Sequence, residues 1–346
     1  MEMPTEQARE SVPPALGFAL SVARTRNVFS ATTLRRLERV CHIVDPVPLE
    51  RFDDARAQAV LAQAKILVTG WGCPPIDRSV VALAPRLRLI AHAAGTVKTF
   101  IAREILAGEV IVTHAAAANA LPVAEFTLAA IVFANKHVFR LRRIYAEARS
   151  GIEPGGWADE GLGNYRKVIG IIGASLIGRR VIELLRPFDF AVLLYDPFVT
   201  ADHTKAWGVE LCDLDTLMAT SDIVSLHAPA LPTTRHMIDA QRLARLRDGA
   251  TLINTARGWL VDQAALEAEL ITGRLDAVID VTEPEILPAD SPLYALPNVL
   301  LTPHIAGALG TEQERLGDLI VAEIERYVRG EPLLHAIRPE RLERMA

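Results

Sequence analysis

The stretch that decides the fold is VIGIIGASLIG, residues 168–178. Its first five residues form an apolar run typical of a buried strand, and the residues from Leu176 onward have the apolar spacing of a helix. Between them lies G-x-S-x-x-G, where dinucleotide-binding α/β units carry G-x-G-x-x-G. Gly173 permits the tight turn, and Gly178 permits close packing of helix on strand. Ser175 replaces the middle glycine, and its hydroxyl can bond a phosphate or cap the helix.

An acidic residue stands at the offset that this motif requires. The next predicted strand, residues 191–194, leads to Asp196, which is 18 residues after Gly178. A carboxylate at about this distance binds the ribose hydroxyls of a dinucleotide and repels a 2′-phosphate. Pro197 follows Asp196, and no arginine stands there. The pattern favours NAD over NADP.

Strand and helix patterns alternate on both sides of this motif, which indicates an α/β fold with parallel sheets. Predicted strands before the motif are residues 16–21, 42–44, 66–69 and 87–91, with a helix at 32–40. Six strands are predicted around and after it, at 168–172, 191–194, 223–226, 251–254, 277–280 and 299–301. The predicted fold has two Rossmann-like or flavodoxin-like domains. The boundaries assign residues 122–307 to the NAD-binding domain, and residues 1–121 with 308–346 to a discontinuous substrate-binding domain.

Three further regions of the chain lie outside these series. Residues 122–138 predict a long apolar helix with Pro122 in its first turn. The stretch 115–134 is interrupted by Asn119, Pro122 and Glu125, so we expect it to fall short of a membrane span. Residues 150–164 are rich in glycine and acidic residues and predict a loop, and residues 311–329 predict a helix that returns to the first domain.

Composition excludes several classes of function. The chain has 346 residues and a formal net charge of −5, so nothing favours nucleic acid or an anionic membrane as the partner. Its three cysteines lie far apart and form no CxxC pair, so neither a disulfide framework nor a metal site is predicted. The first residues are polar and acidic, unlike a signal peptide. We expect a cytoplasmic protein.

Four runs carry a resemblance to a known family: SLHAP at 225–229, LINTARGWLVD at 252–262, DVTEPEILPADSPL at 280–293 and LTPHIAG at 301–307. In this order they resemble the NAD-dependent D-2-hydroxyacid dehydrogenases, which include phosphoglycerate dehydrogenases and glyoxylate/hydroxypyruvate reductases. The resemblance implies an oxidoreductase that moves a hydride between NAD(H) and a D-2-hydroxy acid/2-keto acid pair. It also implies a cleft between the two domains and a homodimer, with helix 122–138 contributing contacts.

Three residues in these runs are predicted to be catalytic. Arg257 follows a strand at the carboxyl end of the sheet, and its planar guanidinium can clamp a carboxylate while polarising the neighbouring carbonyl. His304 follows another strand and can exchange the proton that ketone reduction requires. Glu285 can orient the imidazole and favour its charged form, and the resemblance implies this pairing. Nearby Glu283 is expected to be solvated.

The remaining site residues follow from the motifs and the resemblance. The predicted cofactor-binding residues are Gly173, Ser175, Leu176, Ile177, Gly178, Asp196, His227, Ala228, Pro229, Thr255, Ala256, Asp280, His304 and Gly307. Family members bind the substrate carboxylate through a glycine-rich loop, which corresponds here to residues 93–97. The predicted substrate-binding residues are Trp71, Gly95, Thr96 and Arg257. Thr96 and Lys98 depart from the glycine and aspartate usual in the family, so the resemblance implies the type of reaction and not a particular acid.

Other functions fit the same fold. Corepressors similar to this family keep the fold and much of the site, so an NAD-sensing binding protein is the alternative. A formate-type dehydrogenase is disfavoured, because such relatives carry glutamine in the position of Glu285. Turnover of a keto acid separates the enzyme from the sensor.

Overall fold

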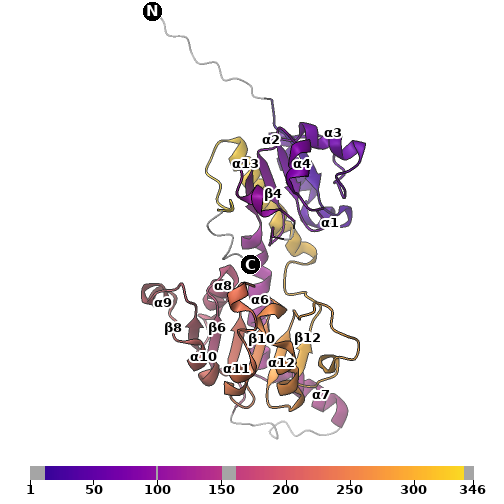
Figure 1. Ribbon diagram of the computed structural model, residues 1–346. Helices are drawn as coiled ribbons and strands as arrows, with labels where there is room; N and C mark the ends of the chain where they lie inside the picture. Colours follow the sequence, from indigo (N-terminus) through magenta and orange to yellow (C-terminus); the bar gives the residue numbers. More distant parts are fainter. Residues whose placement is uncertain (1–11, 99, 150–160, 339–346) are drawn as a thin grey trace, which may run out of the picture. The chain divides into compact units, whose positions relative to one another are not determined.

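The computed structural model describes residues 12–98, 100–149 and 161–338. The chain divides into two compact units (Figure 1). The first unit contains the residues up to Asn119 together with the segment that begins at Gly310, and the second unit spans Ala120–Leu309. Most of the predicted loop at 150–164 lies outside the described residues.

The first unit is built on a five-stranded parallel sheet in the order β2-β1-β3-β4-β5, the flavodoxin-like order. Its strands are β1 (Ala15–Ala19), β2 (His42–Ile43), β3 (Ile66–Thr69), β4 (Leu89–His92) and β5 (Ile111–His114). The interior strands β3 and β4 are buried along their whole length, as expected for a sheet covered on both faces.

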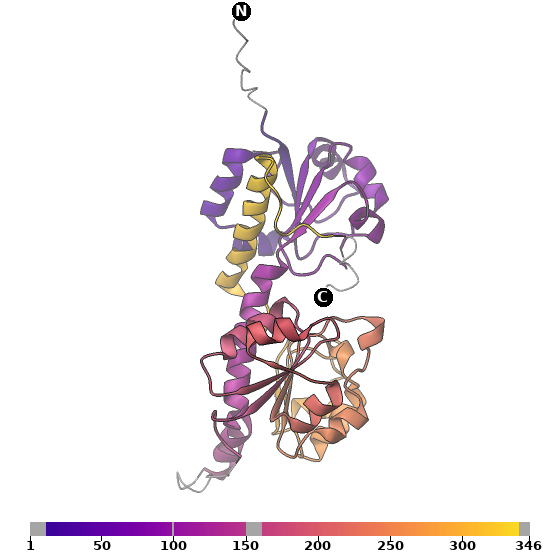
Figure 2. The same cartoon turned by 90° about the vertical axis from the view of Figure 1, so that its left-hand side faces the viewer.

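Helices cover both faces of this sheet. They are α1 (Val22–Val28), α2 (Ala31–Val40), α3 (Ala55–Gln63), α4 (Arg78–Leu83), α5 (Arg103–Leu106) and α13 (Glu314–Val328). One core joins β3 and β4 to α3, α4 and α5. Helix α13 arrives from the far end of the sequence and packs beside α2 (Figure 2), where the Arg36 guanidinium bonds both oxygens of Glu325 at 3.0 Å.

The second unit is a seven-stranded parallel sheet in the order β12-β11-β10-β9-β6-β7-β8. The strands are β6 (Val168–Ile172), β7 (Ala191–Tyr195), β8 (Glu210–Leu211), β9 (Ile223–Leu226), β10 (Thr251–Asn254), β11 (Asp276–Ile279) and β12 (Val299–Leu301). Numbered within the unit, this is the doubly wound order 3-2-1-4-5-6 with one strand added. The predicted fold class, two α/β domains with parallel sheets, is confirmed. Strands β5 and β8 were not predicted, and β8 has only two residues.

Two apolar cores lie on the two faces of the second sheet. One contains residues of α10 (Leu214–Thr220), α11 (Ala240–Arg245) and α12 (Gln263–Ile271). The other contains residues of α6 (Ala116–Ala134) and α8 (Leu176–Leu185). The remaining helices of the unit are α7 (Val138–Ala148) and α9 (Ala201–Trp207).

Helix α6 differs from its prediction. It begins at Ala116, so Pro122 lies inside the helix rather than in its first turn. The alanine-rich segment before Pro122 extends the helix, because alanine is the best helix former. The helix ends before His137, whose left-handed φ of 48° separates it from α7. The expectation that α6 falls short of a span was wrong: by length and composition alone it could cross a membrane, although 44% of its most apolar window is buried in the protein.

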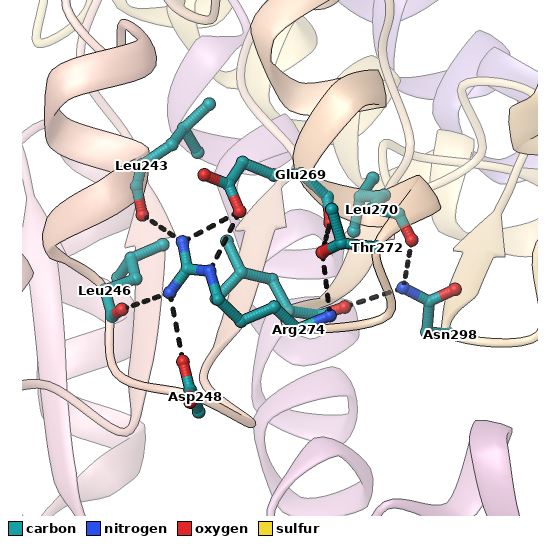
Figure 3. A network of polar contacts seen from close by, with 9 residues as sticks. Leu243, Leu246, Asp248, Glu269, Leu270, Thr272, Arg274 and Asn298 are labelled. Atoms are coloured by element: carbon teal, nitrogen blue, oxygen red, sulfur yellow. Dashed lines mark hydrogen bonds and ion pairs between the residues drawn. The ribbon is translucent and has the colours of Figure 1, made fainter.

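Charged groups at the amino edge of the second sheet are satisfied by the protein itself. Arg274, just before β11, donates to the carbonyls of Leu243 and Leu246 at the end of α11 and to the carboxylate of Glu269 (Figure 3). The Glu269 hydrogen bond is the main cause of a raised Arg274 pKa, which burial partly opposes. Asn298 similarly donates to the Leu270 and Leu275 carbonyls. These side chains hold α11, α12 and β11 together.

Candidate active site

The glycine turn lies where the chain reverses its direction through the second sheet, between β6 and β9. Gly173 has a φ of +98°, and a Cβ there would lie 2.7 Å from the Ala228 nitrogen. A Cβ on Gly178 would lie 2.0 Å from the Gly173 oxygen. Both positions exclude any side chain, so the loops after β6 and β9 can meet at the carboxyl edge. Open α/β sheets bind their ligands at such a switch point.

The start of α8 fits the phosphates of a dinucleotide. Ser175 caps the helix, because its Oγ accepts a hydrogen bond from the Gly178 N–H at 3.2 Å. Its own O–H remains available to donate. Among the described residues, the N–H groups of Leu176 and Ile177 have no hydrogen-bond partner. These free amides lie at the positive end of the helix dipole, so a diphosphate can bind them without displacing another contact.

Asp196 connects the end of β7 to this turn. Its Oδ2 accepts from the Ala174 N–H at 2.7 Å, and its Oδ1 accepts from the Phe198 N–H at 2.8 Å. A carboxylate oxygen can accept more than one hydrogen bond, so both oxygens retain capacity for ribose hydroxyls. The residues present therefore fit an NAD-type ligand.

His227 lies beneath the turn. Its side chain is buried, and burial lowers its pKa to about 3, so the imidazole is neutral. Its Nε2 lies 3.0 Å from the Ser225 Oγ, while its Nδ1 has no partner among the described residues. The buried ring supports the turn from below, and a direct contact with a cofactor stays a prediction.

The other predicted cofactor residues of this unit lie at the same edge. Ala228 and Pro229 follow β9, Thr255 and Ala256 follow β10, and Gly307 lies six residues after the end of β12. Because parallel strands present all their carboxyl ends at one edge, these segments lie above a single side of the sheet. Their contacts with a cofactor stay predictions.

Arg257 follows β10 at this edge and lacks an anionic partner of its own. Among the described residues, its guanidinium donates a side-chain hydrogen bond only to the carbonyl of its neighbour Ala256, at 2.6 Å, and no carboxylate forms an ion pair with it. Burial lowers its pKa, against the raising effect of Glu285 nearby. Asn254 fixes its backbone by donating to the Arg257 carbonyl at 2.9 Å. A partly buried, unpaired guanidinium is suited to bind an incoming carboxylate.

Gly258 joins the loop of Arg257 to the loop of Glu285. A Cβ at this position would lie 2.1 Å from the Thr282 carbonyl carbon and 2.5 Å from the Glu283 nitrogen. The two backbones are therefore in direct contact. This contact sets the distance between the guanidinium and the carboxylate, and no other residue type fits it.

Glu285 and His304 form a hydrogen-bonded pair. The Glu285 Oε1 lies 2.5 Å from the His304 Nδ1, and both side chains are about half exposed, at 59% and 49%. Because Nδ1 is engaged, Nε2 is the ring atom left to exchange a proton with a ligand. Arg257, Glu285 and His304 thus lie at one edge of one sheet, although 47 residues separate the first from the last.

Asp280 holds the segment that carries His304. Its buried carboxylate accepts three hydrogen bonds, from the Thr302 hydroxyl at 2.6 Å, the Ile305 N–H at 2.8 Å and the Ala306 N–H at 2.9 Å. These bonds stabilise the left-handed backbone of His304, whose φ is 54°. The resemblance implied a cofactor contact for Asp280. The observed contacts show that it also shapes the histidine loop.

Glu283 corrects one expectation. It was expected to be solvated, but its carboxylate lies 3.6 Å from both the Arg235 guanidinium and the His236 Nε2. Arg235 in turn lies over the Trp259 ring, 4.3 Å from its centroid. The loop before Glu285 is therefore anchored on a cation that stacks on an aromatic ring.

In the first unit, the loop after β4 presents unpaired amides. The N–H groups of Thr96 and Val97 have no partner among the described residues. Beneath the loop, burial lowers the pKa values of His92 and His114 to about 4, while the backbones of Thr96 and Gly95 raise them. The loop predicted to bind a carboxylate, which contains Gly95 and Thr96, therefore has two N–H groups that can donate to a ligand.

Three residues that shape the site were not predicted from the sequence: Asn254, Gly258 and Thr302. Asn254 and Gly258 lie within the quoted run 252–262, and Thr302 lies within 301–307. The sequence feature that could have indicated them is their closeness in the chain to Arg257 and His304. Their roles depend on contacts with loops distant in sequence, which spacing alone does not reveal.

A doubly wound unit with a glycine turn at its switch point defines a dinucleotide-binding α/β protein. Residues 136–306 match the profile of the D-isomer specific 2-hydroxyacid dehydrogenase NAD binding domain. The (S)-sulfolactate dehydrogenase of Chromohalobacter salexigens is 33% identical over 303 residues, covering 84% of this chain and 93% of that protein. The chain belongs to the D-isomer specific 2-hydroxyacid dehydrogenase family, and its cofactor is NAD(H).

Other relatives differ in length. The D-3-phosphoglycerate dehydrogenase of Methanocaldococcus jannaschii is 30% identical over 276 residues, or 78% of this chain, but this chain spans only 51% of it. A crystal structure of a D-isomer specific 2-hydroxyacid dehydrogenase from Xanthobacter autotrophicus, in complex with NADPH and MES, has a TM-score of 0.73 and 26% identity. That comparison covers 96% of this chain and 100% of the other.

Proposed function

We propose that this protein is an NAD-dependent dehydrogenase that interconverts a D-2-hydroxy acid and a 2-keto acid. The observation that carries the proposal is the Glu285–His304 pair, 2.5 Å apart, beside an arginine without an anionic partner. A 2-keto acid presents a carboxylate and a polarised carbonyl on adjacent carbons. A cation and a proton donor at one sheet edge match these two groups.

In the direction of reduction, bound NADH supplies the hydride that forms the new C–H bond. Arg257 binds the carboxylate of the acid and stabilises the charge that develops on the carbonyl oxygen. His304 donates the proton from Nε2 to that oxygen as the C=O double bond becomes a single bond. Glu285 holds Nδ1 and stabilises the imidazolium before the transfer. In oxidation, Nε2 accepts the hydroxyl proton.

For the first unit we propose that the free amides of the 93–97 loop bind the substrate carboxylate. Trp71, at the end of β3, is proposed to contact the rest of the acid. The names of two relatives specify acids with a phosphate or a sulfonate group. The substrate proposed here is a small 2-hydroxy or 2-keto acid.

The proposal is tested by NADH oxidation with a panel of 2-keto acids of graded size and charge. We expect turnover of at least one acid by the wild type, and losses of about 10²–10⁴-fold in His304→Ala and Arg257→Ala. His42→Gln, at an exposed histidine of β2, is the control and retains wild-type activity. Full activity in both site variants contradicts the assigned roles. Absence of turnover, with a protein partner captured only in the presence of NADH, supports an NAD-sensing protein instead.

The preference for NADH over NADPH is tested by thermal unfolding with each cofactor. Asp196 is expected to repel a 2′-phosphate, so NADH should raise the melting temperature more than NADPH does. A ligand at 100 times its Kd adds about 2.7 kcal/mol to the free energy of unfolding. A larger shift with NADPH, the cofactor named in the Xanthobacter structure, would overturn the preference.

We further propose that the protein acts as a cytoplasmic homodimer. Light scattering of the purified chain tests the dimer, and cell fractionation tests the location. A monomer at micromolar concentration, or recovery with the membrane fraction, contradicts these two proposals respectively.

A further inference from the structure

Arg24, in the first unit, is a cation held over an aromatic ring at the edge of the sheet. Its guanidinium carbon lies 5.4 Å from the centroid of the Trp71 ring. Arg24 is exposed and Trp71 is half-buried. Among the described residues, neither the guanidinium nor the Trp71 indole N–H has a hydrogen-bond or ion-pair partner. A ring-stacked guanidinium keeps the donors at its rim free for a ligand.

The backbone fixes Arg24 and Trp71 relative to each other. The Ser21 N–H donates to the Trp71 carbonyl at 2.9 Å. A Cβ on Gly72, whose φ is +82°, would lie 2.7 Å from the Ser21 Cβ, so the two loops are in direct contact. Glu50 also contacts this segment, but its Oε1 accepts a hydrogen bond from the Val22 N–H at 2.9 Å.

These loops and the 93–97 loop lie along one edge. Arg24 follows β1, Trp71 follows β3 and Gly95 follows β4, and the three strands are neighbours in the sheet. The Ala93 N–H donates to the Thr69 carbonyl at 2.7 Å, which joins the second loop to the third. Two strand spacings amount to about 10 Å. A three- or four-carbon acid and the reach of an arginine side chain together cover this span.

We propose that Arg24, stacked on Trp71, binds a second anionic group of the substrate, so that the preferred acids are 2-keto and 2-hydroxy acids with a carboxylate, sulfonate or phosphate at the far end. This inference rests on the proposed function and adds the substrate class. The amides of Thr96 and Val97 bind the carboxylate next to the reacting carbon, and Arg24 binds the distal anion. A neutral distal group makes no charge-assisted bond with the guanidinium.

The experiment compares kcat/KM for doubly charged acids (oxaloacetate, 3-sulfopyruvate and 3-phosphohydroxypyruvate) with kcat/KM for pyruvate and hydroxypyruvate. The wild type is expected to prefer at least one doubly charged acid. In Arg24→Met the ratio of doubly to singly charged substrates falls about 10- to 100-fold, mainly through KM, because one charge-assisted hydrogen bond is lost. Arg24→Lys retains part of the ratio. Arg26→Met removes a cation from the same helix and is the matched control.

A binding measurement without turnover accompanies the kinetics. In the presence of NAD, malonate should raise the melting temperature of the wild type more than acetate does, and Arg24→Met should abolish the difference. The carboxylate, sulfonate and phosphate substrates are assayed separately, so the highest kcat/KM shows which anionic group is preferred. An unchanged ratio in Arg24→Met, or an equal fall in Arg26→Met, overturns the inference while the proposed function stands. Absence of turnover with every keto acid refutes the proposed function itself.

Discussion

The two edges of the seven-stranded sheet each carry an arginine, and the two arginines differ in their hydrogen-bond and ion-pair partners. Arg274, at the amino edge, donates to two helix-terminal carbonyls and a carboxylate (Figure 3). Arg257, at the carboxyl edge, is partly buried, and within the described part of the chain its guanidinium bonds only the carbonyl of its neighbour. Hydrogen bonding raises the Arg274 pKa, whereas burial lowers that of Arg257.

The glycines at the two edges differ in the same way. Gly249 and Gly273, in the turns of the amino edge, have positive φ and open space around them. Gly173, Gly178 and Gly258, at the carboxyl edge, are packed against other backbones. One edge needs glycine only for its conformation, and the other needs it to bring loops together. The charge of Arg274 at the amino edge is therefore satisfied within the fold, whereas the charge of Arg257 at the carboxyl edge has no anionic partner among the described residues.

The sharpest test of this contrast is Arg257→Met. We expect kcat/KM to fall about 10³-fold or more, because a charged clamp acting in the transition state is lost. The free energy of unfolding should stay the same or rise by about 1 kcal/mol, because a desolvated charge without a partner is removed. Steady-state kinetics and urea unfolding measure the two effects. A stability loss equal to that of a buried ion pair would show that Arg257 is structural.

Gly258→Ala is the variant with the next largest expected effect, on both stability and kcat. The added methyl meets the Thr282–Glu283 backbone and must push apart the loops of Arg257 and Glu285. We expect a loss of about 3 kcal/mol in the free energy of unfolding, together with at least a 10²-fold fall in kcat. Gly249→Ala is the control at the other edge, where only backbone strain of about 1 kcal/mol applies. Equal kcat values in the two variants would remove Gly258 from the site.

Arg274→Met tests the amino edge. Its loss leaves Glu269 and two carbonyls without their donor, and we expect the free energy of unfolding to fall by about 2 kcal/mol. Values of kcat and KM should remain within about twofold of wild type, since a charge that positions no catalytic group does not affect the transition state. Thermal unfolding measures the change in stability, and steady-state kinetics measures kcat and KM. Lost activity at unchanged stability would erase the contrast between the two edges.

The smallest expected effect depends on pH and concerns His227. Its folded pKa, about 3, lies below the ordinary value near 6.5, so acid protonates the unfolded chain first. The stability associated with the neutral imidazole is complete above pH 6.5 and is lost as the pH falls toward 3. Between pH 7 and pH 4.5, the free energy of unfolding should fall by about 2 kcal/mol less in His227→Gln than in the wild type. Parallel stability curves for the two proteins would contradict the burial argument.

Much of this site was predictable from local sequence. The strand at 168–172, the glycine turn and the carboxylate at Asp196 depend on the period of apolar residues and on one turn, so their spacing predicts their positions. The strand-end positions of Arg257 and His304 also follow from local pattern, because both residues come directly after predicted strands. The start of α6 was wrong, since alanine extends a helix past the proline that was expected to begin it. Strand β8 was missed because its two residues, Glu210 and Leu211, are both exposed and form no apolar run.

The sequence by itself determined the class of fold, the nature of the cofactor and the residue types available at the sheet edges, because these are set by neighbours in the chain. Only the tertiary structure decided which charges are satisfied and which stay open. Glu283 lies near Glu285 in sequence, yet it pairs with Arg235 and His236 from a different loop, whereas Glu285 pairs with His304. Burial and hydrogen bonding depend on what packs against a side chain, and those partners come from segments that the fold alone brings together.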